Sequence, residues 1–279
     1  MTANLMTISA IFAAMLFLSI VETVIPLRKR GAWNGRHLIP NLALAALTIA
    51  FSAALNIGML LGLVWLEARG WGLLNLIMLP AAVEIVIVVA ALDLAWYATH
   101  VSMHKSTLLW RFHAVHHSDP AVDVTTTIRQ HPGETVIRYL YLAAFGFAVG
   151  ASPLAFAIYR AWSALHGLFE HANIRLPQWL DTAITFVFSS PNMHKVHHSR
   201  DQRHADRNYT NIFSIWDRLF GTFTPARLGR DVDYGLEGFD AAHHQTTSGL
   251  LLLPLRVGRE AEGRARTTTV TPNSAAQSL

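Results

Sequence analysis

The stretch RFHAVHHS, from Arg111 to Ser118, is almost repeated later in the chain as NMHKVHHS, from Asn192 to Ser199. Both copies space their histidines as His-x-x-His-His, and on a helix this spacing brings three imidazoles to one side. Imidazoles so placed can converge on a metal ion, so each copy is typical of a metal site. The two copies supply His113, His116, His117, His194, His197 and His198.

Upstream of the first copy, the stretch DLAWYATHVSMHK adds two histidines four residues apart. On a helix, His100 and His104 lie one above the other on the same face. Asp93 is expected on that face as well, where its carboxylate can accept the outer N–H of a ligand histidine. Chance clustering, or polar caps at a membrane surface, would not explain two copies of one spacing beside this third pair.

The number of histidines predicts two metal ions. Eight convergent imidazoles are too many for one ion, because a structural zinc takes four ligands. Imidazole alone leaves the metal open, since zinc, copper, iron and nickel all accept it. The chain has no cysteine, which excludes thiolate sites, Fe–S clusters and disulfides. It also lacks the HExxH motif of a zinc protease.

The composition predicts a membrane protein. Hydrophobic residues make up 52% of the 279 residues and charged residues only 14%, a balance too apolar for an ordinary soluble domain. The formal net charge is +4, but the basic residues are scattered between apolar runs. An anionic membrane surface is therefore the expected neighbour, and no nucleic acid is expected as a partner.

Apolar runs long enough to cross a bilayer cover residues 5–27, 38–66 and 73–99. A fourth run, 136–168, is broken at Gly150–Pro153, where glycine and proline predict either two short spans or a re-entrant hairpin. The predicted fold is an all-α integral membrane protein. It has four to five transmembrane helices and a cytoplasmic helical cap that carries the histidine boxes.

The charges of the loops predict how these spans are oriented. The loop 28–37 is strongly basic and the loop 67–72 is nearly neutral, and positively charged loops stay in the cytoplasm. The N-terminus is therefore expected outside and the histidine boxes inside, in a multi-pass protein of a bacterial inner membrane. A histidine-rich metal transporter is the rival class. It would place ionisable groups along a transmembrane path, whereas these histidines gather on one side.

The order of the three boxes resembles that of the fatty acid hydroxylase/sterol desaturase superfamily of integral-membrane di-iron oxygenases. The stretches VDVTTTIRQHPGE, HGLFEHANIRLP and DRNYTNIFSIWDRLFGTF also look like that family's intervening segments, with NYT where relatives often have NYG. The resemblance covers about residues 91–224, so the catalytic region is expected there. Residues 1–90 would hold the N-terminal spans and residues 225–279 a C-terminal segment with a disordered tail.

Carried over residue by residue, the resemblance implies two iron ions and nine histidine ligands. The segment between the last two boxes also offers His166 and Glu170, and His131 and Asp93 are further candidates for a ligand or an outer role. The implied ligands are His100, His104, His113, His116, His117, His171, His194, His197 and His198.

The activity that the resemblance implies is O2-dependent hydroxylation of a lipid, whether fatty acyl, alkyl or sterol-like. Two electrons must come from a separate ferredoxin, cytochrome or flavoprotein reductase, because the chain shows no dinucleotide fingerprint and no Fe–S cysteines. Desaturation, or oxidation of a sterol C-4 methyl group, is the alternative on the same scaffold, since the outcome depends on how the substrate is held.

The sequence also predicts the position or role of a few residues outside the boxes. His37, beside the basic loop, is expected at the surface, and Trp216 and Asp217 are expected to anchor the cap. Glu22, in the first span, has no partner that the sequence identifies. The stretch HPGE, which ends at Glu134, looks like the HPGG of cytochrome b5 domains, but no soluble haem domain surrounds it.

Overall fold

The structure is a computed structural model that describes residues 2–29 and 35–258, with side chains described for 9–29 and 37–258. Within these ranges the chain forms helices and isolated β-bridges but no β-sheet, so the all-α prediction is confirmed there. The predicted disordered tail beyond residue 258 and the middle of the basic loop 28–37 lie outside the described residues.

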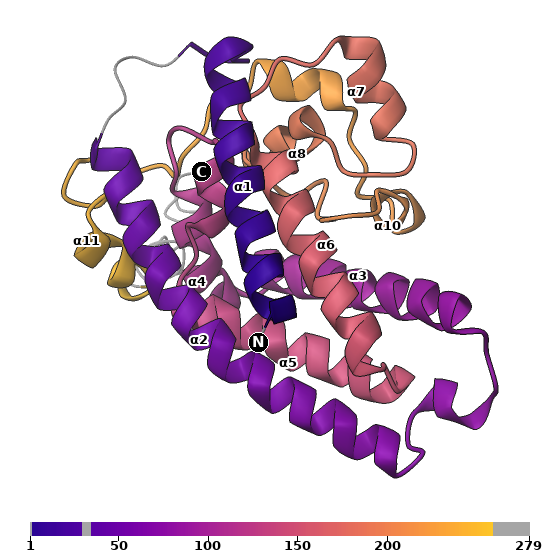
Figure 1. Cartoon of the computed structure of the whole chain (residues 1–279). Helices are drawn as coiled ribbons and strands as arrows, with labels where there is room; N and C mark the ends of the chain where they lie inside the picture. The colour runs from indigo at the N-terminus through magenta and orange to yellow at the C-terminus, as the bar shows by residue number, and fades with distance from the viewer. Residues whose placement is uncertain (1, 30–34, 259–279) are drawn as a thin grey trace, which may run out of the picture.

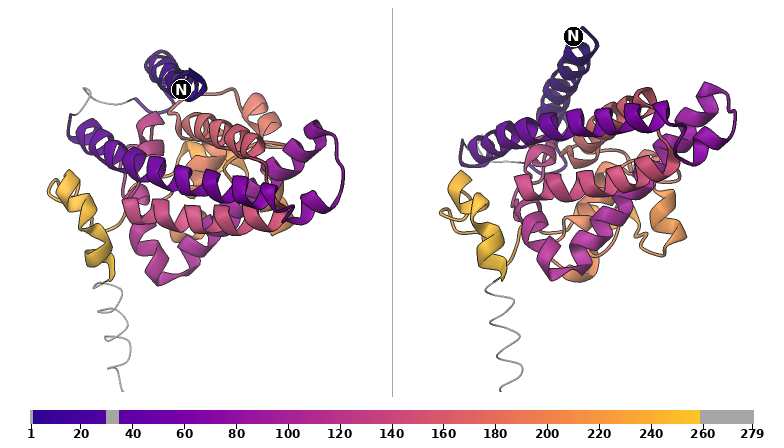
Figure 2. Two further views of the ribbon diagram at one scale, coloured as in Figure 1. Left: turned by 60° about the horizontal axis from the view of Figure 1, so that its bottom comes forward. Right: turned by 90° about the horizontal axis from the view of Figure 1, so that it is seen from below.

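Long helices form the body of the molecule (Figure 1). Helix α2 lies along α5 (Figure 2), and α1 packs against α6. The main core lies where Leu92 of α3, Leu142 of α5 and Phe156 of α6 meet. These long helices are α1 Thr2–Val24, α2 Gly35–Ala68, α3 Ala81–Lys105, α5 Pro132–Val149 and α6 Pro153–His171.

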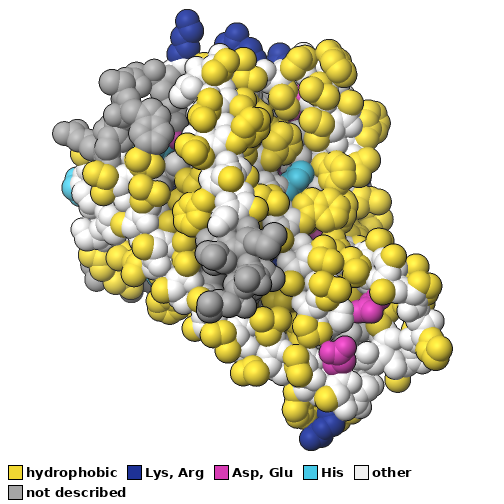
Figure 3. All heavy atoms as spheres, in the orientation of Figure 1, with side chains coloured by type: hydrophobic (Ala, Val, Ile, Leu, Met, Phe, Trp, Pro, Cys, Tyr) yellow, Lys and Arg dark blue, Asp and Glu magenta, His cyan; other side chains and the backbone are white. Residues whose placement is uncertain are grey.

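Two helical segments, His37–Leu76 and Ala81–Lys105, are long and apolar enough to cross a membrane. In the most apolar part of each segment, only 17% of the first and 33% of the second is buried. Most of these side chains therefore face outward. Figure 3 shows one face covered largely by hydrophobic side chains, with Lys and Arg at its upper and lower edges. Such an apolar surface is typical of a membrane protein. The four to five spans and the cytoplasmic side of the cap stay predictions.

The predicted third span starts at the wrong residue. Gly72, with φ of 111°, precedes the short 3₁₀ helix η1 Leu73–Leu76, and α3 begins only after Pro80. A helix that ran on through Pro80 would lose a backbone hydrogen bond and clash with its own preceding turn. Helix α3 therefore begins at Ala81 and not at Leu73.

The predicted break in the fourth apolar run is confirmed. Gly150 ends α5 in the left-handed conformation, with φ of 77°. The Ser152 hydroxyl accepts the Ala155 N–H at 3.3 Å and caps α6, and Pro153 stands in its first turn. The chain passes very close to η1 here, because a Cβ added to Gly150 would lie 2.9 Å from the Cα of Gly72.

Shorter helices carry the two His-x-x-His-His boxes. Helix α4 Thr107–His117 follows α3 directly, and Ser106 caps it by accepting the Leu109 N–H at 3.4 Å. Helix α8 Pro191–His197 starts after Ser190, whose hydroxyl accepts the Met193 N–H at 3.2 Å. The remaining short helices are η2 Val124–Ile128, α7 Gln178–Ile184, α9 Gln202–Ala205, α10 Ile215–Leu219, η3 Ala226–Arg230 and α11 Thr247–Leu251.

Candidate metal centre

Nine histidines from α3, α4, α6 and α8 collect in two groups, and they are the nine that the sequence singled out. Within each group the candidate ligand atoms lie within 4.8 Å of one another. Their role as ligands stays a prediction. The first group is His100, His104, His113, His117 and His197; the second is His116, His171, His194 and His198.

The structure corrects one expectation about the two His-x-x-His-His boxes, because each of them is shared between the two groups. On α4, the pair His113 and His117 faces the first group while His116 faces the second. At α8 the division is reversed, with His197 in the first group and the pair His194 and His198 in the second. Residues four apart share a helix face more closely than neighbours do, so each box spans both groups.

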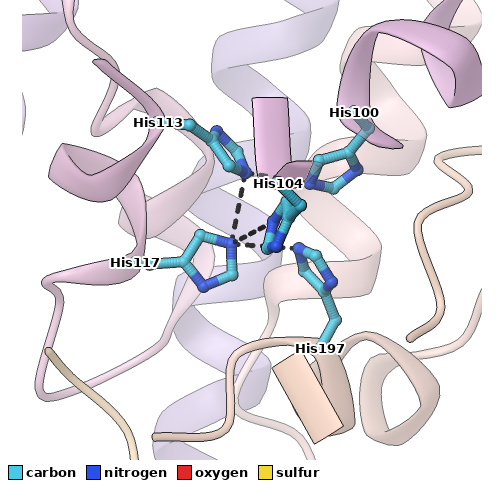
Figure 4. A group of neighbouring side chains, drawn as sticks. All are labelled: His100, His104, His113, His117 and His197. Carbon is cyan, nitrogen blue, oxygen red and sulfur yellow. Dashed lines mark hydrogen bonds between the residues drawn. The ribbon is translucent and has the colours of Figure 1, made fainter. Parts of the chain in front are cut away.

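In the first group, the imidazoles turn their Nε2 atoms toward a common centre (Figure 4). Nε2 of His113 lies 2.9 Å from Nε2 of His100 and 3.2 Å from Nε2 of His117. Nε2 of His117 also lies 3.2 Å from that of His104 and 3.0 Å from that of His197. Five rings on three helices thus present the same nitrogen to one point.

The second group repeats this arrangement with four rings. Nε2 of His171 lies 3.1 Å from Nε2 of His116 and 3.0 Å from Nε2 of His194. Nε2 of His198 lies 3.2 Å from those of His171 and His194. His117 of the first group stacks on His198 of the second, with ring centroids 4.7 Å apart, so the two groups are direct neighbours.

The outer nitrogens show which ring nitrogen carries the proton in the first group. For four of its histidines Nδ1 lies within reach of an oxygen, so Nδ1–H donates and the lone pair of Nε2 faces the centre. The acceptors are the Tyr209 carbonyl for His100 at 2.6 Å, the Arg207 carbonyl for His197 at 2.9 Å, Glu134 Oε1 for His113 at 3.0 Å and Asp206 Oδ1 for His104 at 3.3 Å.

In the second group the outer nitrogens have fewer partners. Nδ1–H of His171 donates to the Gly167 carbonyl at 2.8 Å. Glu170 lies nearby, with Oε2 3.6 Å from Nδ1 of His194, a separation too long for a hydrogen bond. Nδ1 of His116, His194 and His198 is buried without a hydrogen-bond partner among the described residues.

Both groups fit metal ions. A neutral imidazole has a single N–H, and where Nδ1 uses it, the clustered Nε2 atoms have none to share with one another. Imidazole nitrogens bind a first-row metal at about 2.1 Å, which brings ligands of one ion to about 3 Å apart. The observed separations match, so each group has the donor atoms and the spacing for one ion.

Burial keeps the box histidines in the neutral form that metal binding requires. In both boxes the pKa of every histidine lies well below its ordinary value. Burial is the largest cause, because it penalises the charged form, and neighbouring histidines add to the effect. These residues are His113, His116, His117, His194, His197 and His198.

The further ligand candidates His131, His166 and Glu170 lie outside the two histidine groups. His131 caps α5, with Nδ1 accepting the Gly133 N–H at 2.9 Å, and His166 donates from Nε2 to the Ser189 carbonyl at 3.0 Å. Neither belongs to a histidine group in the described part of the chain. Glu170 lies beside the second group, as described above.

The expectation that Asp93 accepts from a ligand histidine is wrong. Its carboxylate accepts the backbone N–H groups of Ile212 at 3.1 Å and Phe213 at 2.9 Å, and the indole N–H of Trp216 at 3.0 Å. Asp93 therefore ties the segment after the third box to α3. Asp217 has a similar anchoring role, since it accepts the Tyr209 N–H at 2.8 Å.

Two carboxylates beside the first group were missed. Glu134 stands in the sequence only as the end of the HPGE stretch, and no spacing points to Asp206, which lies far along the chain from His104. A buried ion pair with Arg138 also holds Glu134. An acidic residue placed shortly after a histidine box was the available signal for Glu134.

Two further residues have partners that the sequence did not reveal. His37 is not a free surface residue, because its ring pairs with Asp119 at 3.2 Å and Asp123 at 3.0 Å. Glu22 accepts the backbone N–H groups of Val124 at 2.8 Å and Asn173 at 2.6 Å. Both link N-terminal helices to segments that follow the histidine-bearing helices.

Residues 85–222 match the family model described as fatty acid hydroxylase. This region includes all nine histidines of the two groups. This region is similar to the fatty acid hydroxylase/sterol desaturase superfamily. The resemblance read from the histidine boxes is thus confirmed.

Several characterised members of this superfamily are similar to the chain. Alkylglycerol monooxygenase of Danio rerio is 32% identical over 52% of this chain and 31% of its own length. Ornithine lipid hydroxylase OlsE of Rhizobium tropici is 30% identical over 57% of this chain and 47% of its own length. A very-long-chain aldehyde decarbonylase of Oryza sativa subsp. japonica is 26% identical over 56% of this chain and 60% of its own length.

The chain spans less than half the length of the first two relatives. No solved structure matches it.

Proposed function

We propose that the protein is a membrane oxygenase that uses two iron ions, O2 and external electrons to hydroxylate a lipid. The observation that carries this proposal is the pair of buried histidine groups with their Nε2 atoms about 3 Å apart. Relatives named as a monooxygenase and a lipid hydroxylase support the same reading.

The nine histidines would hold the two ions, five around the first and four around the second. Iron in this setting supplies the redox chemistry that activates O2, for which imidazole ligands are well suited. The chain's own residues orient the histidine rings and exclude water from the centre. The Tyr209 and Arg207 carbonyls fix the rings of His100 and His197, and burial of the histidines keeps water away from the centre.

The substrate is proposed to be a lipid taken from the bilayer, either fatty acyl, alkyl or sterol-like. The outward apolar faces of α2 and α3 would lie in contact with lipid, and α3 leads directly to His100 and His104. A lipid chain lying along these helices would reach the histidine groups without crossing water. The names of the relatives, which specify alkylglycerol and ornithine lipid, favour a polar lipid among these classes.

The electrons would come from a separate ferredoxin, cytochrome or flavoprotein reductase. The protein is further proposed to be multi-pass, with four to five spans and with the histidine groups on the cytoplasmic side of a bacterial inner membrane. Residues 91–224 would form the catalytic region, following N-terminal spans in 1–90 and preceding the C-terminal segment 225–279.

The function can be tested on purified protein in lipid nanodiscs, loaded with iron and supplied with a reduced ferredoxin and its reductase. We expect two irons per chain and hydroxylated lipid in the wild type. The His197→Ala variant should have less iron and no product, whereas His131→Ala should retain its iron. A wild-type protein without iron, or equal product from His197→Ala, would refute the proposal.

A further inference from the structure

The outer hydrogen bonds of the two histidine groups differ in charge. In the first group, two ligand candidates donate to carboxylates: His113 to Glu134 and His104 to Asp206. In the second group, the one donated bond runs from His171 to the neutral carbonyl of Gly167. This contrast concerns the hydrogen-bond acceptors around the two groups and not the nine histidines themselves.

The carboxylates of the first group are themselves held in place. Glu134 is buried and pairs with Arg138, whose guanidinium also lies over the Trp96 ring at 3.9 Å. Asp206 is paired with Lys105 at 2.7 Å. In each case a cation favours the ionised form of the carboxylate, although for Glu134 burial acts in the opposite direction. Both carboxylates accept Nδ1–H of a histidine in the first group.

A carboxylate acceptor makes the imidazole a more basic ligand and fixes the orientation of its ring. Both effects strengthen the bond from Nε2 to a metal ion. They are largest where water is excluded, as around His113 and Glu134, because the local dielectric constant is low.

The second group lacks these supports. Nδ1 of His116, His194 and His198 is buried without a hydrogen-bond partner, and the nearest carboxylate, Glu170, stands 3.6 Å from Nδ1 of His194. These three rings therefore have no outer hydrogen bond that fixes their orientation, and no carboxylate accepts a hydrogen bond from their Nδ1.

We propose that the two metal positions are unequal: the first group binds its ion tightly, and the second holds an ion that exchanges readily. Glu134 and Asp206 are the positioning residues that create this difference, acting through His113 and His104. The proposal rests on the proposed function, because it presumes that both groups bind iron. It concerns the order in which ions are bound and lost, whichever lipid is oxidised.

The test is the time course of iron release from purified, Fe²⁺-loaded protein under argon in the presence of the chelator ferrozine. The wild type should release one ion per chain quickly and the other slowly. His198→Ala, which removes a ligand of the second group, should lack the fast phase and retain the slow one. His197→Ala, a change at the neighbouring residue, should lack the slow phase.

The carboxylate variants then identify the cause of the difference. Glu134→Gln keeps the shape of the side chain and removes its charge, so the slow phase should accelerate about 10–100-fold. Asp206→Asn should accelerate the slow phase as well. Because Asp206 is partly exposed, this variant tests the role of the carboxylates even where Glu134→Gln fails to fold. Glu170→Gln, the matched change beside the second group, should leave the slow phase unchanged.

Release of both ions at one rate, or wild-type slow phases in both Glu134→Gln and Asp206→Asn, would overturn the inference while leaving the proposed function intact. A slow phase that disappears in His198→Ala would overturn it too. Failure of the wild type to take up any iron would instead overturn the proposed function, and the inference with it.

Discussion

Asp93 shows what the spacing of residues along one helix can and cannot predict. Helical periodicity placed it on the same face as His100, and that led to the expectation of a contact with a ligand. The carboxylate is instead occupied by three N–H groups from the segment between Ile212 and Trp216. Periodicity describes one helix, whereas this contact depends on a segment more than a hundred residues away along the chain.

Replacing Asp93 should therefore damage stability. In Asp93→Ala, the N–H groups of Ile212, Phe213 and Trp216 lose their acceptor inside the protein, and one such buried donor costs about 1–3 kcal/mol. We expect a loss of about 3 kcal/mol or more in the free energy of unfolding, measured by denaturant titration in detergent. Glu84→Ala, on the same helix, should cost less than about 1 kcal/mol. Equal stability of the two variants would contradict the anchoring role.

Eight of the nine clustered histidines could be found from the sequence because their spacing is local within each box, and His171, which lies outside the boxes, was implied by the family resemblance. Their division into two groups could not, since it depends on how α3, α4, α6 and α8 meet. The outer acceptors were harder still. Glu134 and Asp206 are ordinary acidic residues, and only the folded chain brings them to His113 and His104.

At the scale of the helix, the turn between α5 and α6 was predictable and the start of α3 was not. Glycine and proline at 150–153 mark the turn directly. The residues 73–79 are as apolar as the helix that follows, so hydropathy alone could not separate η1 from α3. The signal that was overlooked is Pro80, which precedes the first residue of α3.

The Gly150 turn provides a test at this scale. Gly150→Ala should cost about 1–2 kcal/mol from the left-handed backbone alone, and more because the new Cβ would meet the backbone of Gly72. Thermal unfolding in detergent should show a clear fall in Tm. The matched change Gly58→Ala, inside α2 with open space around it, should raise stability by about 0.5–1 kcal/mol. A Gly150→Ala protein as stable as the wild type would show that the turn has another conformation.

At the scale of the whole molecule, the neutral histidines make the metal-free protein sensitive to acid. The pKa of each histidine in the two boxes is lowered by burial in the folded state, so below about pH 6.5 the unfolded chain binds protons that the folded chain does not. Stability present above that pH is therefore lost as the pH falls. We expect the Tm of metal-free protein to drop steadily between about pH 7 and 5. A Tm that does not change over this interval would mean that these side chains are accessible to water.

The orientation in the membrane is a second property of the whole molecule. Reporter fusions at Arg69, after α2, and at Lys105, at the end of α3, should report opposite sides, periplasmic for the first and cytoplasmic for the second. The reason is that α3, which is long and apolar enough to cross a membrane, lies between them. Reporters that give the same signal at both positions would contradict the orientation proposed for the histidine groups.

The central claim is that the two histidine groups support the oxidation of a lipid by O2, and labelled oxygen tests it most directly. Membranes that contain the protein would be incubated with isotopically labelled O2 and a reduced electron donor, and their lipids then analysed by mass spectrometry. We predict a lipid with a new hydroxyl group that carries the label, formed only when the donor is present and absent with His197→Ala. Loss of two hydrogens without label would instead identify a desaturase. Lipid turnover that proceeds equally without O2 would contradict the oxygenase assignment.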